Sequence, residues 1–275
     1  SPRRGLWARL NRRAVEVLAR AAQGDADGEL HGRAALADLA DRVIRPAPPA
    51  PAPPGGLVRP CFLGIVPTRA CNGSCTYCDF GATAAPRAIL DPRLAVVAVD
   101  WMAESVRAAG RDVLEVHFFG GEPFQAQEVL ACAVHRTRLQ AARLGVTPHL
   151  EASTNGVHDE ALMRWAGDHF DAIVLSLDGP AELHDRHRPL VGGGGSHAAA
   201  LRTARLLGRA PADLCLRACI STQNVARMRD IASYFSRELT PSVVDFETVC
   251  ETPASRAAEV LAPDPFAFAR GFAAA

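Results

Sequence analysis

The 275 residues of the chain include 30 lysines and arginines against 30 aspartates and glutamates. This length allows one large domain and a small appendage, because a single core rarely grows beyond about 250–300 residues. The balanced charge gives no field that would attract nucleic acid or anionic lipid, so neither is predicted as a partner. No apolar run reaches the roughly 18 residues of a membrane span, and the arginine-rich start lacks the features of a signal peptide. We therefore expect a cytoplasmic protein.

The N-terminal part predicts a small helical segment followed by a stiff linker. Two helical patterns, around 14–22 and 34–43, are joined by a polar, glycine-containing stretch. The sequence PAPPAPAPP at 46–54 cannot donate the hydrogen bonds of a helix or inner strand, and it favours polyproline II. The predicted divisions are a helical segment at 1–45, a linker at 46–58 and a main domain at 59–275.

Short apolar runs alternate with helical periodicity in the main domain, which is typical of parallel βα units and predicts an α/β fold. The predicted strands are 61–67, 113–119, 148–153, 172–177, 214–221 and 243–249. The predicted helices are 92–109, 126–144, 159–167, 196–207 and 224–237. A last helical pattern begins at residue 265 and stops without a closing element, so we expect a fragment of a longer chain.

Three of the eight cysteines, Cys71, Cys75 and Cys78, crowd together directly after the first predicted strand. The crowding indicates a metal in a reducing compartment rather than a disulfide scaffold. Soft thiolates select zinc or iron–sulfur clusters, and three ligands leave one coordination position open for chemistry. Asn72 and Gly73 allow the loop to turn tightly enough to aim the sulfurs at one point. A zinc knuckle with a distant fourth ligand and simply packed cysteines remain alternatives.

Three more motifs stand at the ends of the next three predicted strands. They are Gly-Gly-Glu-Pro at 120–123, Ser-Thr-Asn-Gly at 153–156, and Ser-Leu-Asp-Gly-Pro at 176–180, the last followed by His-Asp-Arg-His-Arg at 184–188. Functional residues of βα barrels collect at the carboxyl ends of strands, so one mouth would receive all of these motifs. Taken singly, each glycine-containing motif also fits a simple turn.

These four motifs together resemble the radical S-adenosylmethionine (SAM) superfamily. The CxxxCxxC spacing, with Tyr77 before the third cysteine, resembles the family's hallmark, and residues 120–123 resemble its GGEP motif. The run at 176–188 resembles the SLDG…HD..R pattern of the SPASM and twitch group, which includes sulfatase-maturing enzymes and maturases of ribosomal peptides. The resemblance covers roughly residues 60–248 and implies a partial (β/α)6 TIM-like barrel. It also implies a 4Fe-4S cluster on the three cysteines.

The resemblance further implies a SAM site at the strand ends. Glu122 supplies an acceptor for the methionyl amine, and the guanidinium of Arg188 suits the SAM carboxylate. Polar side chains of the third and fourth motifs can bond ribose hydroxyls or anchor the strand ends. The predicted SAM-binding residues are Tyr77, Gly120, Gly121, Glu122, Pro123, Ser153, Asn155, Ser176, Asp178 and Arg188.

The reaction that the resemblance implies is reductive cleavage of SAM to a 5′-deoxyadenosyl radical that abstracts hydrogen from a substrate. An external one-electron reductant is then a required partner, and no general base is predicted for this step. The SLDG pattern implies a ribosomally made peptide or a protein side chain as substrate, and the segment at 1–45 resembles leader-peptide recognition modules. No cysteine-rich auxiliary-cluster domain follows Thr248, which departs from the SPASM group. A radical SAM enzyme acting on a small molecule or nucleotide, and a non-enzymatic zinc-binding module, remain alternatives.

The remaining cysteines are interpreted as core residues rather than ligands, because free cysteine is often a small buried hydrophobe. Cys215 and Cys219 lie on one face of a predicted strand, and Cys61, Cys132 and Cys250 receive the same interpretation. His184 and His187 are expected to be surface side chains.

Overall fold

The computed structural model describes residues 15–18, 20, 59–78, 80 and 88–275. The chain divides into two compact units, Ser1–Val58 and Arg59–Ala275. In the first unit the described residues are helical, and Val17 is buried. The rest of the predicted segment at 1–45, and the predicted linker at 46–58, lie outside the described residues.

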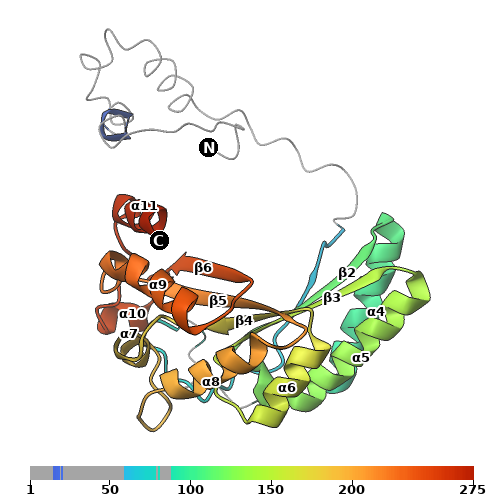
Figure 1. Ribbon diagram of the computed structural model, residues 1–275. Coiled ribbons are helices and arrows are strands. Elements are labelled where there is room, and N and C mark those ends of the chain that lie inside the picture. The colour runs from blue at the N-terminus through green and yellow to red at the C-terminus, as the bar shows by residue number, and fades with distance from the viewer. Residues whose placement is uncertain (1–14, 19, 21–58, 79, 81–87) are drawn as a thin grey trace. The chain divides into compact units, whose positions relative to one another are not determined.

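The second unit is built on one parallel sheet of six strands, which lie side by side in chain order (Figure 1). The strands are β1 (Leu63–Ile65), β2 (Val113–Phe118), β3 (Thr147–Thr154), β4 (Ala172–Ser176), β5 (Asp213–Ile220) and β6 (Val243–Thr248). Each lies where the sequence predicts a strand. The expected α/β fold, a partial (β/α)6 barrel, is confirmed.

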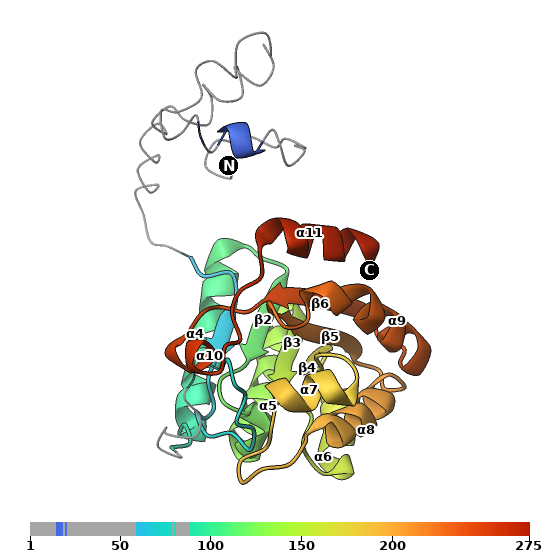
Figure 2. The same cartoon turned by 90° about the vertical axis from the view of Figure 1, so that its left-hand side faces the viewer.

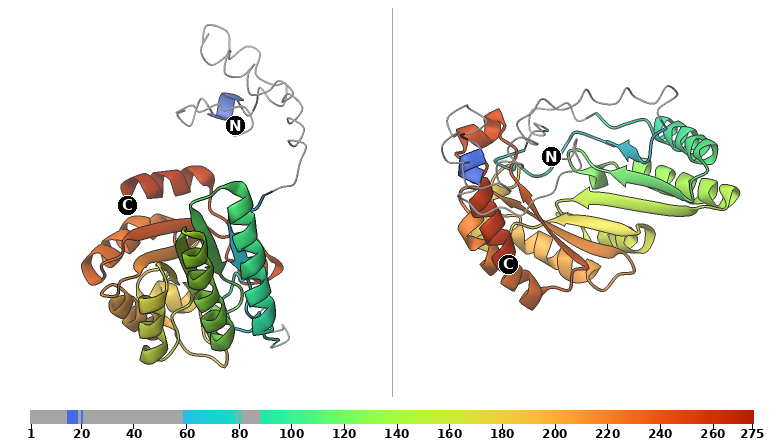
Figure 3. Two further views of the ribbon diagram at one scale, coloured as in Figure 1. Left: turned by 90° about the vertical axis from the view of Figure 1, so that its right-hand side faces the viewer. Right: turned by 90° about the horizontal axis from the view of Figure 1, so that it is seen from above.

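The long helices follow the strands and cover one face of the sheet (Figures 1 and 3). They are α4 (Pro92–Ala109), α5 (Gln127–Leu144), α6 (Glu160–His169), α8 (His197–Leu207), α9 (Met228–Glu238) and α11 (Pro265–Ala274). The short helices are η2 (Pro123–Gln125), α7 (Ala181–His187), η3 (Val225–Arg227) and α10 (Pro253–Ala257). Neither α7 nor α10 is predicted by the sequence. Among the described helices, none combines the length and apolar character needed to cross a bilayer.

The ends of α4 show why its predicted bounds hold. The Asp91 side chain accepts a hydrogen bond from the Arg93 backbone N–H, and Pro92 occupies the first helical position. The helix ends at Gly110, whose φ of 61° is left-handed. These two signals fix both ends of the helix in the sequence itself.

The two faces of the sheet differ in character. On β2, Leu114, Val116 and Phe118 pack into the core beneath the helices, whereas Glu115 and His117 point to the opposite face. This opposite face, called here the inner face, also includes the half-buried residues His149, Glu151, Cys215 and Arg217 of β3 and β5. The inner face is therefore polar, and the carboxyl ends of the strands border it at the level of the predicted site.

Candidate functional site

The cysteine loop at 71–78 follows β1 and is fixed by the segment that follows α7. The Ser74 N–H donates to the Pro189 carbonyl at 2.7 Å, and the Thr76 N–H donates to the His187 carbonyl at 2.9 Å. Backbone hydrogen bonds are the strongest positional restraint available to a short loop without regular structure. The loop therefore depends for its shape on a segment more than 100 residues later in the chain.

The thiols of Cys71, Cys75 and Cys78 line one cavity of about 440 Å³, together with Gly73, Gly121 and three alanines of α10 and its C-terminal cap. A Cβ added at Gly73 would stand 3.5 Å from the Cys71 sulfur and 3.7 Å from the Cys75 sulfur. Glycine at this position keeps the space between the two sulfurs free. The three sulfurs that the sequence predicts as ligands are thus brought to one place.

The thiols need a cationic centre to become ligands. Burial is the largest influence on Cys75 and raises the pKa of its thiol to about 11, although the Arg188 guanidinium acts in the opposite direction. Burial also raises the pKa of Cys71, against hydrogen bonds from Gly73 and Asn155. Metal binding and loss of the thiol protons are therefore coupled at this site.

The Gly-Gly-Glu-Pro motif packs against the start of the cysteine loop. Gly120 has a φ of 132°, and a Cβ on Gly121 would meet the backbone oxygens of Arg69 and Ala70 at 2.3 Å. The Gly121 N–H donates to the Thr68 carbonyl at 3.1 Å. The close approach that these glycines allow is thus with the chain's own backbone, while Gly121 also borders the thiol cavity.

Glu122 is buried and occupied by internal partners. Its carboxylate accepts hydrogen bonds from the Phe124 N–H at 3.2 Å, the Thr154 hydroxyl at 2.9 Å and the Asn155 N–H at 2.8 Å. His158 Nε2 lies 3.1 Å from the same carboxylate, outside hydrogen-bonding geometry. Glu122 therefore joins the end of β2 to the end of β3, and Pro123 begins the buried turn beside it.

Asn155 connects the third motif to the cysteine loop. Its side-chain amide donates to Asn72 Oδ1 at 2.6 Å and lies 3.6 Å from the Cys71 sulfur. Its Oδ1 accepts from the Val157 N–H at 2.9 Å, which closes the turn after β3. The predicted turn is therefore present, and the side-chain amide of Asn155 is directed at the cysteine loop.

Asp178 is the centre of a buried network under the same loop. Its carboxylate accepts from the Tyr77 hydroxyl at 2.8 Å, from Arg188 Nε at 3.0 Å and from the Cys219 N–H at 2.9 Å. The Arg188 guanidinium also lies 5.3 Å from the centre of the Tyr77 ring. The structure places Arg188, predicted to bind the SAM carboxylate, against an internal carboxylate, with 8% of its surface exposed.

The expectation that His184 and His187 lie at the surface is wrong, because each is 1% exposed. His184 Nδ1 accepts from the Asp178 N–H, and its Nε2 lies 2.9 Å from the Ser196 hydroxyl. Burial lowers the pKa of His184 to about 4, against the pull of Asp178, so the ring is neutral at physiological pH. Helix α7 thus buries two histidines that anchor the fourth motif.

Cys215 and Cys219 do not belong to the hydrophobic core, which corrects their interpretation from sequence. Both lie on the inner face beside Arg217, while the alternate residues of β5 are buried under the helices. The Arg188 guanidinium reaches the Cys219 sulfur at 3.5 Å, and burial raises the pKa of that thiol to about 11. Cys61 and Cys250 are exposed and Cys132 is partly buried, so none of them is a core residue either.

Ser153 and Ser176 lie near the carboxyl ends of β3 and β4, and both are partly exposed. They alternate with residues that are buried under the helices, so their side chains are directed to the inner face. Among the predicted SAM-binding residues, Ser153 and Ser176 have polar side chains that take part in none of the internal hydrogen bonds described above.

Helix α10 forms one wall of the thiol cavity, a feature that the sequence does not reveal. The helix is labelled at the left of Figure 2. The alanines of this wall are Ala254, Ala257 and Ala258. The helix starts with a capping box, in which the Ser255 N–H donates to the Thr252 hydroxyl at 3.0 Å and the Thr252 N–H donates to the Ser255 hydroxyl at 2.8 Å. In the sequence, only the pattern Thr-Pro-Ala-Ser at 252–255 could have indicated the start of this helix.

Thr252→Ala is expected to lower the free energy of unfolding by about 1 kcal/mol, because it removes the capping hydroxyl of α10. Urea unfolding of the metal-free chain measures this effect. Ser236→Ala, on the exposed side of α9, is the matched control and should leave the unfolding midpoint unchanged. Equal midpoints for Thr252→Ala and the control would show that the cap does not hold α10 in place.

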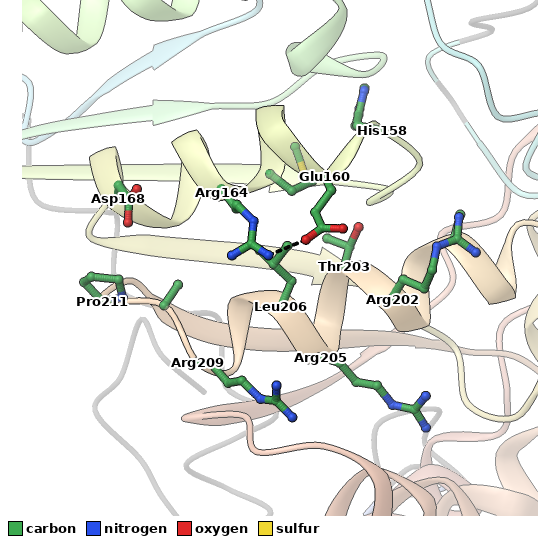
Figure 4. Close-up of a pocket in the computed structure, with 13 residues that line it drawn as sticks. His158, Glu160, Arg164, Asp168, Arg202, Thr203, Arg205, Leu206, Arg209 and Pro211 are labelled. Carbon is green, nitrogen blue, oxygen red and sulfur yellow. Dashed lines mark hydrogen bonds and ion pairs between the residues drawn. The ribbon is translucent and has the colours of Figure 1, made fainter.

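Another cavity lies elsewhere, on the outer helical layer between α6 and α8 (Figure 4). It has a volume of about 520 Å³, and its rim includes four arginines, Arg164, Arg202, Arg205 and Arg209. Arg164 is paired with Glu160, and Arg205 pairs with Glu238 at 2.7 Å. The thiol cavity is the better candidate site, because it joins metal-ligating side chains to the strand ends, whereas size alone says nothing of chemistry.

Several solved structures have a similar fold. Native anSMEcpe with bound AdoMet and Cp18Cys peptide matches with a TM-score of 0.61 and 20% identity, over 69% of this chain and 51% of that chain. Streptococcus suis SuiB bound to S-adenosylmethionine matches with a TM-score of 0.54 and 14% identity, over 70% of this chain and 42% of that one. Spore photoproduct lyase with bound AdoMet and a dinucleoside spore photoproduct matches with a TM-score of 0.50 and 15% identity, over 71% and 59% of the two chains.

At these identities the likeness shows a shared fold, and the chain spans about half the length of the first of these proteins. A comparison with curated proteins found no significant match. The model of the radical SAM superfamily matches residues 65–233, which is more than half of the chain and contains the cysteine loop and all three further motifs. The chain therefore belongs to the radical SAM superfamily, whose enzymes use a 4Fe-4S cluster and SAM.

Proposed function

We propose that Cys71, Cys75 and Cys78 ligate the 4Fe-4S cluster of this radical SAM enzyme, and that the enzyme modifies a ribosomally made peptide or a protein side chain. The observation that supports the metal site most strongly is the set of three thiols around the space that Gly73 keeps free. When bound, the reduced cluster supplies the electron that cleaves SAM and so starts hydrogen abstraction from the substrate. The enzyme needs an external one-electron reductant for this step.

The predicted SAM-binding residues then have two kinds of role. Ser153 and Ser176, with Gly121 at the edge of the thiol cavity, are available for direct contact with SAM at the strand ends. The cysteine loop is held against these strand ends by Tyr77 and Asn155, together with the charged residues of the motifs. Rigid positioning of this kind is what a protein contributes when a cofactor supplies the difficult chemistry.

The alanines of α10 and its C-terminal cap form one wall of the thiol cavity, and we infer that this wall keeps water away from a bound cluster. Apolar side chains beside a reactive centre prevent side reactions with solvent. This role is consistent with the position of α10 after β6, outside the six strands that build the sheet.

The peptide substrate is supported by the SLDG…HD..R run at 176–188 and by the fold shared with anSMEcpe, which was solved with a bound peptide. The test incubates the anaerobically reconstituted chain with SAM, dithionite and peptides encoded near its gene. A mass change in one peptide, in step with SAM cleavage, is the expected result.

SAM cleavage without a change in any peptide would count against the peptide substrate and leave the enzyme class intact. The fold shared with spore photoproduct lyase makes a nucleotide substrate the second candidate. Dinucleotides tested in the same assay would then show the mass change that the peptides lack.

A further inference from the structure

A second set of metal-binding side chains lies on the inner face, away from the cysteine loop. Glu115 and His117 are two residues apart on β2, and His149 of β3 stands directly opposite Glu115 in the parallel register. All three are partly buried. Glu115 and His149 are the third residues of their strands and His117 is the fifth residue of β2, whereas the cysteine loop and the other motifs follow the carboxyl ends of strands.

The donor atoms of these three residues converge. One carboxylate oxygen and one ring nitrogen of each histidine all lie within 4.8 Å of one another. The His117 Nε2 lies 2.7 Å from Glu115 Oε1, a hydrogen-bonding separation that a shared tetrahedral zinc ion would widen to about 3.3 Å. Residues i and i+2 of one strand and the opposing residue of its neighbour form a triangle on one face, so the backbone itself arranges the set.

The surroundings of the second ring nitrogen of His117 support a metal site more specifically than the convergence of the three donor atoms alone. His117 Nδ1 lies 3.6 Å from the Glu151 carboxylate, on the side of the ring away from Glu115. A histidine that binds a metal almost always directs its other ring nitrogen at a carboxylate, carbonyl or water, which fixes the ring and its tautomer. Phe62 stacks on the same ring at 5.0 Å and restrains it further.

A simple ion pair between Glu115 and His117 explains these contacts less fully. Such a pair would not require a second imidazole opposite Glu115, nor a second carboxylate behind His117. Two imidazoles and one carboxylate are the donor set of several catalytic zinc sites and of the facial triad that binds Fe(II). Both kinds of site keep at least one coordination position free.

We propose that Glu115, His117 and His149 form a site for a divalent transition-metal ion, with Glu151 orienting His117. Zinc is the test ion, since its affinity for two imidazoles and a carboxylate is high and it has no redox chemistry of its own. The free coordination position faces the inner side of the sheet. This site is separate from the proposed cluster and does not depend on it.

The experiment measures zinc and iron in the full-length reconstituted protein after zinc has been added and free metal removed. Wild type should retain about one zinc per chain, with iron at about four per chain. His149→Ala and Glu115→Gln should lower the zinc affinity at least tenfold and leave iron and SAM cleavage unchanged. His135→Ala, an exposed histidine on the outer side of α5, is the matched control and should bind zinc as wild type does.

Glu151→Gln gives a further readout, because it leaves all three ligands in place. Loss of the carboxylate behind His117 should weaken zinc binding by about 10–100-fold. The proposal would be overturned if wild type retained no zinc, or if His149→Ala and Glu115→Gln bound it as tightly as the His135→Ala control. Loss of iron in Cys75→Ala with zinc still bound would show that the two sites are independent.

Discussion

Asp178→Ala should destabilise the chain by about 3–5 kcal/mol, because it leaves Arg188 buried without its counter-charge. Asp178 is fully buried, and its carboxylate also holds the Tyr77 hydroxyl and the Cys219 N–H. Removing it breaks these two hydrogen bonds as well as the ion pair with Arg188 at 3.0 Å. The effect should appear both as a lower urea midpoint and as a loosened cysteine loop, since Tyr77 is part of that loop.

A double-mutant cycle separates the ion pair from the rest of the network. Asp178→Asn and Arg188→Met should each be strongly destabilising alone, while the double variant should lose less than the sum of the two. A coupling energy of about 2 kcal/mol or more is expected. Additive losses would mean that Arg188 does not rely on Asp178 for its stability.

The pH dependence of stability gives an independent check on Asp178. Burial is the largest influence and by itself raises the pKa of this carboxyl, but Arg188, His187 and His184 together hold it well below the ordinary value of 3.8. The unfolded chain therefore takes up the proton first as pH falls. The stabilisation by Asp178 is complete above the ordinary pKa and is lost as pH drops below it toward the folded value. The difference between wild type and Asp178→Asn should shrink over that acidic range and stay constant at neutral pH.

Glu122→Ala should lower the free energy of unfolding by about 3 kcal/mol or more, the second largest loss expected. The substitution leaves the Phe124 N–H, the Thr154 hydroxyl and the Asn155 N–H buried without an acceptor. Each buried donor without a partner costs about 1–3 kcal/mol. The ends of β2 and β3 would separate, and Asn155 would lose its fixed position beside Cys71.

Glu122→Gln distinguishes lost hydrogen bonds from lost volume. The amide keeps the size of the side chain and one acceptor oxygen, but its NH₂ group faces donors, so we expect a smaller loss of about 1–2 kcal/mol. Urea unfolding of the metal-free chain measures both variants. A loss in Glu122→Gln as large as in Glu122→Ala would show that the negative charge is the main contribution.

The strands and long helices could be predicted because their signals are local. Alternating burial marks β2 and β5, and Asp91, Pro92 and Gly110 mark both ends of α4. The four motifs could be placed at strand ends for the same reason. What a local pattern cannot show is which distant segment covers each motif.

The missed features all depend on such long-range contacts. Helix α7 has seven residues and three histidine or arginine side chains in its last turn, so its buried His184 and His187 resemble an exposed loop in the sequence. Helix α10 has five residues, too few for a periodic pattern. The position of Cys219 could have been predicted, because Arg217 shares its face of β5 and indicates that this face is polar.

Iron analysis of the reconstituted chain tests whether Cys71, Cys75 and Cys78 hold an iron–sulfur cluster. The chain is purified without oxygen, reconstituted with iron and sulfide, and compared with Cys75→Ala and with Cys132→Ala, a partly buried cysteine of α5. We expect wild type and Cys132→Ala to be brown, with about four irons per chain, and Cys75→Ala to be colourless. A colourless wild type that holds zinc on these cysteines would show that they form a zinc site and no iron–sulfur cluster.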